Sequence, residues 1–204
     1  MKAKLVVILG PTAVGKSDLA LDLAAAINGA IVNADSQQVY RYLDIGTGKP
    51  TKAERQRVEH FMIDVVDPDQ EFNAALYRRL AIECIEQIHR RTQNVIVCGG
   101  TGLYLKALTQ GLFEGPGQDH EIRRALEQRI ENDGLAPLYR WLSEIDPSVT
   151  ATIHANDRQR MIRALEVYQA TGKRLSDWQK EHGFQDRNFD LLKIGLNRPR
   201  NELY

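Results

Sequence analysis

The most constraining feature of this sequence is a glycine-rich motif that follows a short apolar run near the amino terminus. Residues 5–9 read LVVIL, which is typical of a strand buried on both faces of a parallel sheet. Residues 10–17 read GPTAVGKS, and apolar residues at helical spacing continue from Ser17 to Ile27. A strand, a G-x-x-x-x-G-K-S loop and a helix in this order indicate a phosphate-binding loop. We therefore expect an α/β fold with a parallel sheet, organised around this loop.

The residue types of the motif explain how it would bind an anion. Gly10 and Gly15 let backbone N–H groups turn inward around a phosphate, and the positive end of the helix dipole begins there. Lys16 adds a full positive charge, and Ser17 offers a hydroxyl to a Mg²⁺ ion. A chance glycine-rich turn is the weaker interpretation, because four fixed positions and their context agree. The expected ligand-binding residues are those of the whole loop: Gly10, Pro11, Thr12, Ala13, Val14, Gly15, Lys16 and Ser17.

Composition limits the class of protein. The chain has 204 residues, and its 27 Lys and Arg equal its 27 Asp and Glu, so no overall basic field indicates nucleic acid. Cys84 and Cys98 have no metal-type spacing and are expected to be small core residues in a reducing compartment. No run approaches the ~18 apolar residues of a membrane span. The first strand begins at once, so we expect no signal peptide, no membrane partner and a cytoplasmic location.

A polar segment follows the second expected strand, residues 29–34. Asp35 stands where this strand ends, and ligands of open α/β sheets collect at the carboxyl ends of strands. Asp35 and Ser36 would otherwise be ordinary turn or cap residues. A third strand is expected over residues 61–66, and a long amphipathic helix over 73–91 is expected to cover the sheet.

A second glycine-rich turn follows the apolar strand expected over residues 94–98. It reads Gly99-Gly100-Thr101-Gly102 and therefore has no carboxylate at the strand end, where nucleoside triphosphatases usually have one. This absence weakens the interpretation as a triphosphatase.

The second half of the chain changes character at about residue 112. Gly115-Pro116-Gly117 marks a boundary, and the following residues show helical patterns up to a strand expected over 191–196. The last of the expected helices spans residues 157–170, with Asn156 as its cap and Gly172 as its end. We therefore divide the chain into a core over residues 1–111, a helical insertion over 112–182 and a returning strand within 183–204. The arginines of the third helix form either a solvated face or a contact for phosphate or RNA.

Four segments together resemble the tRNA dimethylallyltransferase family. They are GPTAVGKS, residues 35–50 (DSQQVYRYLDIGTGKP), residues 95–108 (VIVCGGTGLYLKAL) and residues 153–173 (IHANDRQRMIRALEVYQATGK). The resemblance implies a three-layer fold like that of P-loop NTPases, with an inserted helical unit. It also implies transfer of a prenyl group from dimethylallyl diphosphate to the exocyclic amine of the adenine 3′-adjacent to the anticodon, with Mg²⁺. In the family the loop matching residues 10–17 holds the diphosphate of the donor and does not hydrolyse ATP, despite its nucleotide-binding motif.

The resemblance also assigns roles to residues. Asp35 is the candidate general base, Thr101 would hydrogen-bond the donor and the acceptor, and Ser17 would bind the metal. Arg200 would join the phosphate-binding loop at the diphosphate. Contacts with the tRNA anticodon stem-loop would come from both units: Asp35, Ser36, Gln37, Gln38, Thr101, Arg123, Gln159, Arg160, Met161, Ile162 and Arg163.

Three alternatives remain open on the sequence. A small-molecule or nucleotide kinase would also combine a phosphate-binding loop with an acidic residue after the second strand. A related enzyme could prenylate free adenylate, and a non-catalytic RNA-binding module is the third alternative. Family members continue well beyond the segment that matches residues 200–204, so the chain is expected to be a fragment or a shortened version. We expect a monomer.

Overall fold

The computed structural model describes residues 3–91, 93–113, 115–186, 188–199 and 201. They form two compact units. The first contains residues 1–111 together with 186–204, and the second contains residues 112–185. The first unit is therefore built from two stretches of chain that the helical unit separates. The helical unit begins at residue 112, where the sequence predicts the start of the insertion. It ends at residue 185, three residues beyond the predicted end at 182.

The first unit contains a parallel sheet, which confirms the expected fold class. Its strands are β1 (Ala3–Leu9), β2 (Gly29–Asn33), β3 (His60–Phe61), β4 (Asn94–Cys98) and β5 (Phe189–Gly195). Their order is β3-β2-β4-β1-β5, and all the pairs are parallel. At the centre Leu5 of β1 is in register with Val95 of β4 and with Leu191 of β5. The apolar run of β1 is thus flanked by strands on both sides.

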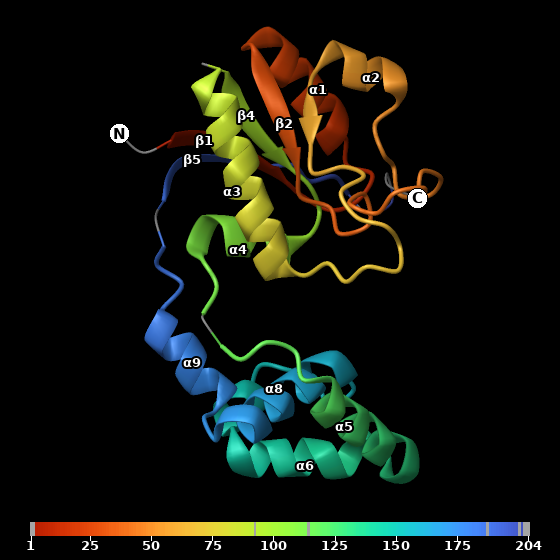
Figure 1. The fold of residues 1–204 in the computed structure, drawn as a ribbon, viewed down its shortest axis with the longest axis vertical. Coiled ribbons are helices and arrows are strands. Elements are labelled where there is room, and N and C mark those ends of the chain that lie inside the picture. Colours follow the sequence, from red (N-terminus) through yellow and green to blue (C-terminus); the bar gives the residue numbers. More distant parts are fainter. Residues whose placement is uncertain (1–2, 92, 114, 187, 200, 202–204) are drawn as a thin grey trace. The chain divides into compact units, whose positions relative to one another are not determined.

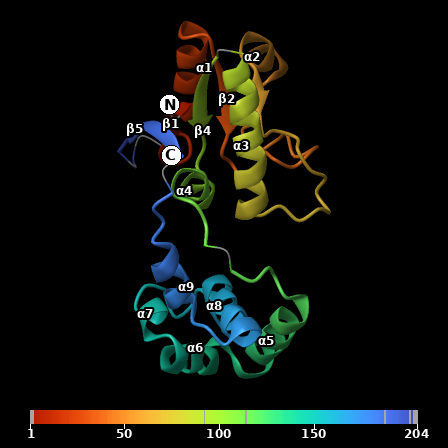
Figure 2. The ribbon, with the colours of Figure 1, turned by 60° about the vertical axis from the view of Figure 1, so that its left-hand side comes forward.

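Helices cover both faces of the sheet (Figures 1 and 2). They are α1 (Lys16–Ala26), α2 (Lys52–Arg57), α3 (Ala74–Arg90) and α4 (Gly102–Gln110). Leu5 and Val7 share one core with residues of α3 and α4, whereas Ile8 shares the opposite core with residues of α1. Successive side chains of a strand point to opposite faces, so the continuous apolar run is explained by two buried faces. Of the four helices, α4 was not predicted from the sequence.

The expected strand over residues 61–66 is wrong in its length. Only His60 and Phe61 pair with β2, because Met62 and Asp64 adopt positive φ angles of 63° and 56°. Such left-handed backbone cannot continue a strand. The next β-type pairing in this segment is at Val66, which forms an isolated parallel bridge with Tyr40.

The second unit is a bundle of helices around one apolar core. Its helices are α5 (His120–Asp133), α6 (Leu135–Ile145), α7 (Pro147–Thr150), α8 (Arg158–Thr171) and α9 (Leu175–His182). Met161, Ala164 and Leu165 of α8 are buried, and Leu126 of α5 and Leu142 of α6 pack in the same core. Gly172 ends α8 in the left-handed conformation, as expected, but the N-cap is Asp157 and not Asn156. The side chain of Asp157 accepts a hydrogen bond from the backbone N–H of Arg160.

Asp146 is a buried acidic residue that organises two helices of this unit. It is 1% exposed. One carboxylate oxygen accepts from the N–H of Val149 in α7, and the other accepts from the N–H of Ser176 in α9. Among the described helices of the chain, none is long and apolar enough to cross a membrane.

Candidate active site

A cavity of about 390 Å³ lies in the first unit where the parallel strands end. Residues of the phosphate-binding loop form one side of it, and Asp35 and Gln38 contribute from the segment after β2. Further lining residues come from strand β2, from Thr47, Gly48 and Pro50, from His60 and Ile63, and from the end of β4 and the turn after it. The cavity thus brings together the loop and the polar segment that the sequence placed at the same sheet edge.

The phosphate-binding loop adopts a conformation that depends on its glycines. Gly15 has φ +92° and occupies the N-cap position of α1. Gly10 has φ +153°, and a Cβ atom there would lie 2.3 Å from the carbonyl oxygen of Leu196, which follows β5. The ammonium of Lys16 donates to the carbonyl oxygen of Pro11 at 2.6 Å, so the side chain is folded over its own loop. The start of a helix and a lysine therefore converge on one side of the cavity.

Asp35 is part of the turn after β2 and also lines the cavity. Its Oδ1 accepts hydrogen bonds from the backbone N–H groups of Gln37 (2.8 Å) and Gln38 (3.4 Å), as expected of a turn residue. The other oxygen, Oδ2, has no hydrogen-bond partner among the described residues, and the side chain lines the cavity. One oxygen is therefore held by the turn while the second is free to accept a proton or a ligand hydrogen bond.

The turn after β4 packs directly on the end of β2. A Cβ atom on Gly99 would lie 2.2 Å from the carbonyl oxygen of Ala34, so only glycine allows this approach. Thr101 donates its N–H to the same oxygen at 3.1 Å. The Thr101 hydroxyl accepts from the N–H of Ser36 at 2.9 Å, and it does not cap α4, although Thr101 stands at the N-cap position. Thr101 thus joins the two loops at the sheet edge, and its hydroxyl hydrogen has no acceptor in the described part of the chain.

The loop that contains Thr47 and Gly48, for which the sequence predicts no role, also lines the cavity. The side-chain amide of Gln38 donates to the carbonyl oxygens of Thr47 and Gly48, each at 3.0 Å. His60 lines the same cavity, and burial lowers its pKa below the usual range. The glycine-interrupted stretch 45–50 was the only signal in the sequence for this loop.

The residues present fit a Mg²⁺ ion that is bound mainly through its ligand. Ser17 and Asp18 line the cavity beside Lys16. Among the described residues there is no group of three or more His, Cys, Asp or Glu that could hold a metal ion by itself. Mg²⁺ characteristically keeps several waters and binds through one or two protein oxygens plus phosphates. The Ser17 hydroxyl next to a bound diphosphate would meet this requirement.

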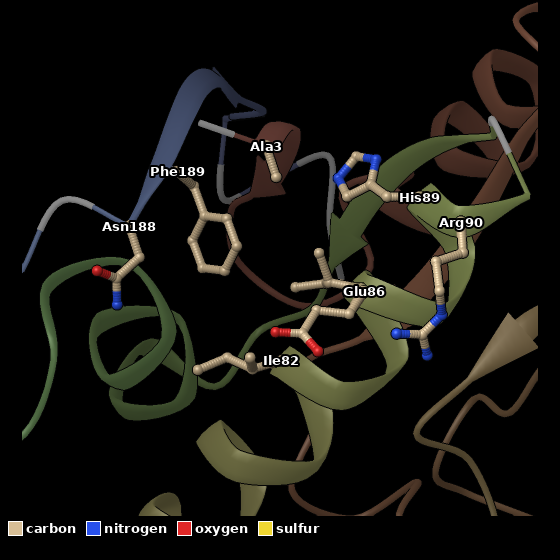
Figure 3. Close-up of a pocket in the computed structure, with 8 residues that line it drawn as sticks. Ala3, Ile82, Glu86, His89, Arg90, Asn188 and Phe189 are labelled. Carbon is tan, nitrogen blue, oxygen red and sulfur yellow. The ribbon is translucent and has the colours of Figure 1, made fainter. Parts of the chain in front are cut away.

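A second cavity, of about 660 Å³, lies at the other end of the strands (Figure 3). It is lined by Ala3 and Phe189 at the starts of β1 and β5, and by Ile82, Glu86 and other residues of α3. It contains none of the residues singled out in the sequence. His89 and Arg90 also line it, but despite its larger volume it includes neither the phosphate-binding loop nor Asp35, so we do not regard it as the active site.

Two arginines of the helical unit bind a buried glutamate. Glu166 is 0% exposed. Arg123 donates to both of its oxygens, at 2.8 and 3.2 Å, and Arg163 donates to Oε2 at 2.8 Å. Burial raises the pKa of Glu166, but the hydrogen bonds of the two guanidinium groups outweigh it, so the net pKa is lowered. Arg163 also donates to the carbonyl oxygens of Pro116 and Gly117, which lie before α5.

The other residues assigned by resemblance to RNA contact divide into two groups. Gln159 and Arg160 are exposed at the start of α8, and Arg160 forms an ion pair with Asp157 at 3.4 Å. Met161 and Ile162 are 0% and 1% exposed, so their side chains belong to the core of the unit. An RNA could therefore contact the side chains of Gln159 and Arg160 directly. Met161 and Ile162 could contribute only through their backbone or by holding the helix in place.

The predicted diphosphate ligand Arg200 lies outside the described residues. A different arginine is near the loop: a guanidinium nitrogen of Arg198 lies 3.9 Å from the position that a Cβ atom on Gly15 would take. Arg198 was not predicted as a ligand-binding residue from the sequence. Its only distinguishing feature there is its place shortly after the strand that returns to the core.

Comparison with known proteins agrees with this arrangement. A family model described as IPP transferase matches residues 38–204. The tRNA dimethylallyltransferase 2 of Geotalea uraniireducens is 52% identical over 203 residues, covering all of this chain and 66% of the relative. The tRNA dimethylallyltransferase of Geobacter sulfurreducens is 51% identical over 203 residues and is covered to 65%. The chain therefore spans less than two thirds of the length of these curated relatives.

Solved structures show the same similarity. The tRNA isopentenylpyrophosphate transferase of Bacillus halodurans is 40% identical with a TM-score of 0.62, covering 99% of this chain and 62% of that one. A eukaryotic dimethylallyltransferase acting on tRNA is 34% identical with a TM-score of 0.74, covering 97% of this chain and 49% of that one. The three-layer fold implied by the family resemblance is thus confirmed. The match of the family model over most of the sequence shows that this chain belongs to the IPP transferase family.

Proposed function

We propose that this chain carries the reaction centre of a tRNA dimethylallyltransferase and acts as a cytoplasmic monomer. It would transfer the dimethylallyl group of dimethylallyl diphosphate to the exocyclic amine of the adenine 3′-adjacent to the anticodon, releasing diphosphate. The observation that carries the proposal is the shared cavity, which is lined both by the phosphate-binding loop and by Asp35, whose Oδ2 has no hydrogen-bond partner among the described residues. The names of the relatives support it, and they do not favour the kinase alternative.

The donor half of the reaction follows from the loop. Its backbone and Lys16 would bind the diphosphate, and they stabilise the negative charge that grows on it as the allylic C–O bond breaks. Ser17 would hold the metal ion together with the diphosphate oxygens. When bound, Mg²⁺ supplies further charge neutralisation for the leaving group. The side chain of Arg198, beside Gly15, adds a second cation to the same region.

The acceptor half follows from the two joined loops. As the new C–N bond forms, the amine nitrogen must lose a proton, and Asp35 Oδ2 can take it because no described hydrogen bond occupies that oxygen. General-base catalysis of this kind is worth about 10²–10⁴-fold. The Thr101 hydroxyl, which accepts a hydrogen bond from the N–H of Ser36, can donate its own hydrogen bond to dimethylallyl diphosphate or to the adenine. Gln37 and Gln38 would contact the edges of the extruded adenine.

The RNA contact would involve both units. Gln159 and Arg160 are exposed on α8, whereas Arg123 and Arg163 share their charge with Glu166. RNA affinity depends strongly on the number of phosphates neutralised, and the chain carries no net charge. We therefore expect binding of an anticodon stem-loop to be sensitive to salt.

The donor site is tested by ligand protection. Inorganic pyrophosphate with Mg²⁺ should raise the thermal unfolding temperature, because a ligand at a hundredfold excess over its dissociation constant stabilises by ~2.7 kcal/mol. Lys16→Ala should remove most of this protection. Lys4→Ala, at an exposed lysine of β1, is the matched control and should keep it. Equal protection of both variants would refute the donor site.

The transfer itself is tested with radiolabelled dimethylallyl diphosphate, with and without tRNA. Label should appear in tRNA, and Asp35→Asn should abolish most of it under single-turnover conditions while leaving pyrophosphate protection intact. Asp69→Asn, in an exposed turn, serves as the control. Near-normal transfer by Asp35→Asn would show that another group accepts the proton. Phosphorylation of a small acceptor from ATP would instead indicate a kinase.

A further inference from the structure

The loop that contributes Thr47 and Gly48 to the cavity is held firmly to the first unit. The side chain of Lys49 is 2% exposed. Its ammonium donates to the carbonyl oxygen of Tyr40 at 2.6 Å and to the carboxylates of Asp44 and Asp64 at 2.9 and 2.7 Å. Burial alone would lower the pKa of Lys49, but its contacts with these carboxylates raise it overall, so the ammonium stays charged. The loop between Tyr40 and Lys49 is therefore fixed at both ends.

Tyr42 in this loop has a backbone conformation that is unfavourable for a tyrosine. Its φ is +65°, which is a left-handed conformation that bulky residues rarely adopt. Its side chain is 79% exposed and forms no hydrogen bond or ring contact with any described residue. Neither the backbone nor the ring gains stability from a tyrosine here, and glycine would fit the backbone better. An observed strain of this kind at the edge of a site is a reason to look for a function.

Tyr42 belongs to the same loop as residues that line the cavity. Thr47 and Gly48 of the same loop line the cavity, and the loop follows the carboxyl end of β2 (Figure 1). Two further apolar side chains of the loop, Leu43 and Ile45, are 39% and 99% exposed. The loop that contributes Thr47 and Gly48 to the cavity therefore also carries an exposed aromatic ring with exposed apolar neighbours.

We propose that Tyr42 stacks on an unpaired nucleobase that neighbours the base entering the cavity. The inference rests on the proposed function, because it requires an RNA substrate. When one base is extruded, its neighbours lose a stacking partner, and this loss opposes extrusion. A rigidly presented aromatic ring replaces the lost partner without reading the identity of the base, since every base has a π-face. The fixed loop lowers the cost of ordering the ring on binding.

The test uses the 204-residue chain and an RNA hairpin in which 2-aminopurine stands next to the target adenine. We compare Tyr42→Ala and Tyr42→Gly with Tyr42→Phe, which keeps the ring. Base–aromatic stacking is worth about 5–150-fold in affinity, which is ~1–3 kcal/mol. Tyr42→Ala and Tyr42→Gly should lose this factor and the fluorescence change of 2-aminopurine, whereas Tyr42→Phe should keep both. Pyrophosphate protection should be the same in all of them.

Stability provides an independent readout. Tyr42→Gly removes the strained side chain and should raise the unfolding temperature by roughly 2–6 °C, so weaker RNA binding by this variant cannot be ascribed to unfolding. Unchanged hairpin affinity in Tyr42→Ala and Tyr42→Gly would overturn the inference and leave the proposed function intact. A wild-type chain that binds pyrophosphate but no hairpin would overturn both. A loss of self-association in Tyr42→Ala, with unchanged RNA binding, would assign the ring to a second copy of the chain instead.

Discussion

The contact between the ends of β2 and β4 offers a sharp test of how the site is assembled. Gly99 and Gly100 are neighbours in one turn, yet an added methyl group would meet different surroundings at the two positions. At Gly99 a Cβ atom would lie 2.2 Å from the carbonyl oxygen and 2.3 Å from the carbonyl carbon of Ala34. At Gly100 nothing lies within 4 Å, and φ is not in the left-handed region.

Gly99→Ala should therefore be strongly destabilising. An ordinary contact of this type is longer by more than 1 Å, and the atoms in the way belong to the backbone of a buried strand end, which cannot rotate aside. Overpacking of this kind costs about 2–3 kcal/mol, which corresponds to a fall of roughly 4–12 °C in the unfolding temperature of a chain of this size. The displacement would also separate Thr101 from Ser36, so pyrophosphate protection should weaken as well.

Thermal unfolding of Gly99→Ala and Gly100→Ala, each with and without pyrophosphate and Mg²⁺, measures both effects. Gly100→Ala should stay close to the wild type, since it loses only backbone freedom of the unfolded chain. The reasoning is refuted if both variants unfold at the same temperature, because the close approach to Ala34 would then have no energetic consequence.

Two further predictions concern the polar contacts. Glu166→Gln should lower the free energy of unfolding by about 3 kcal/mol at pH 7. This value is the lower end of the range for a broken buried ion pair, because Arg123 and Arg163 are partly exposed. The folded-state pKa of Glu166 is below its ordinary value of 4.5, so its contribution is complete above that value and is lost as the pH falls through the lower pKa. The difference in unfolding temperature between the wild type and Glu166→Gln should therefore be largest at pH 7 and should shrink as the pH falls below 4.5. A difference that does not depend on pH would contradict this. Thr101→Val should cost about 1–2 kcal/mol in urea unfolding, because the N–H of Ser36 loses its acceptor, whereas Thr101→Ser should be near neutral; equal loss in both would point to packing instead.

The elements around the phosphate-binding loop could be predicted because their signals are local. The apolar run of β1, the glycines of the loop and the helical spacing after Ser17 all point to one structure, and that structure is observed. The same holds for the end of α8 at Gly172, where a left-handed residue is required. Such features depend on residues only a few positions apart.

Other features depend on packing between distant residues and could not be predicted. The strand beginning at His60 stops because Met62 adopts a positive φ, and nothing in its residue type favours that conformation. The burial of Glu166 requires Arg123 on one helix and Arg163 on another, whereas a glutamate in a helical pattern is usually exposed. The roles assigned to the site residues by resemblance remain predictions.

The interrupted first unit has a consequence for how the protein is made. Gly10 is in close contact with Leu196, and the N–H of Leu196 donates to the carbonyl oxygen of Leu9 at 2.8 Å. A ribosome that has synthesised the loop must therefore still add the chain as far as Phe189 before the strand beside the loop begins. The helical unit is contiguous over residues 112–185 and has an apolar core of its own, so it can fold before the first unit is complete. Stalled nascent chains that expose residues up to 185 should resist proteolysis in the helical unit and show no pyrophosphate protection of the core.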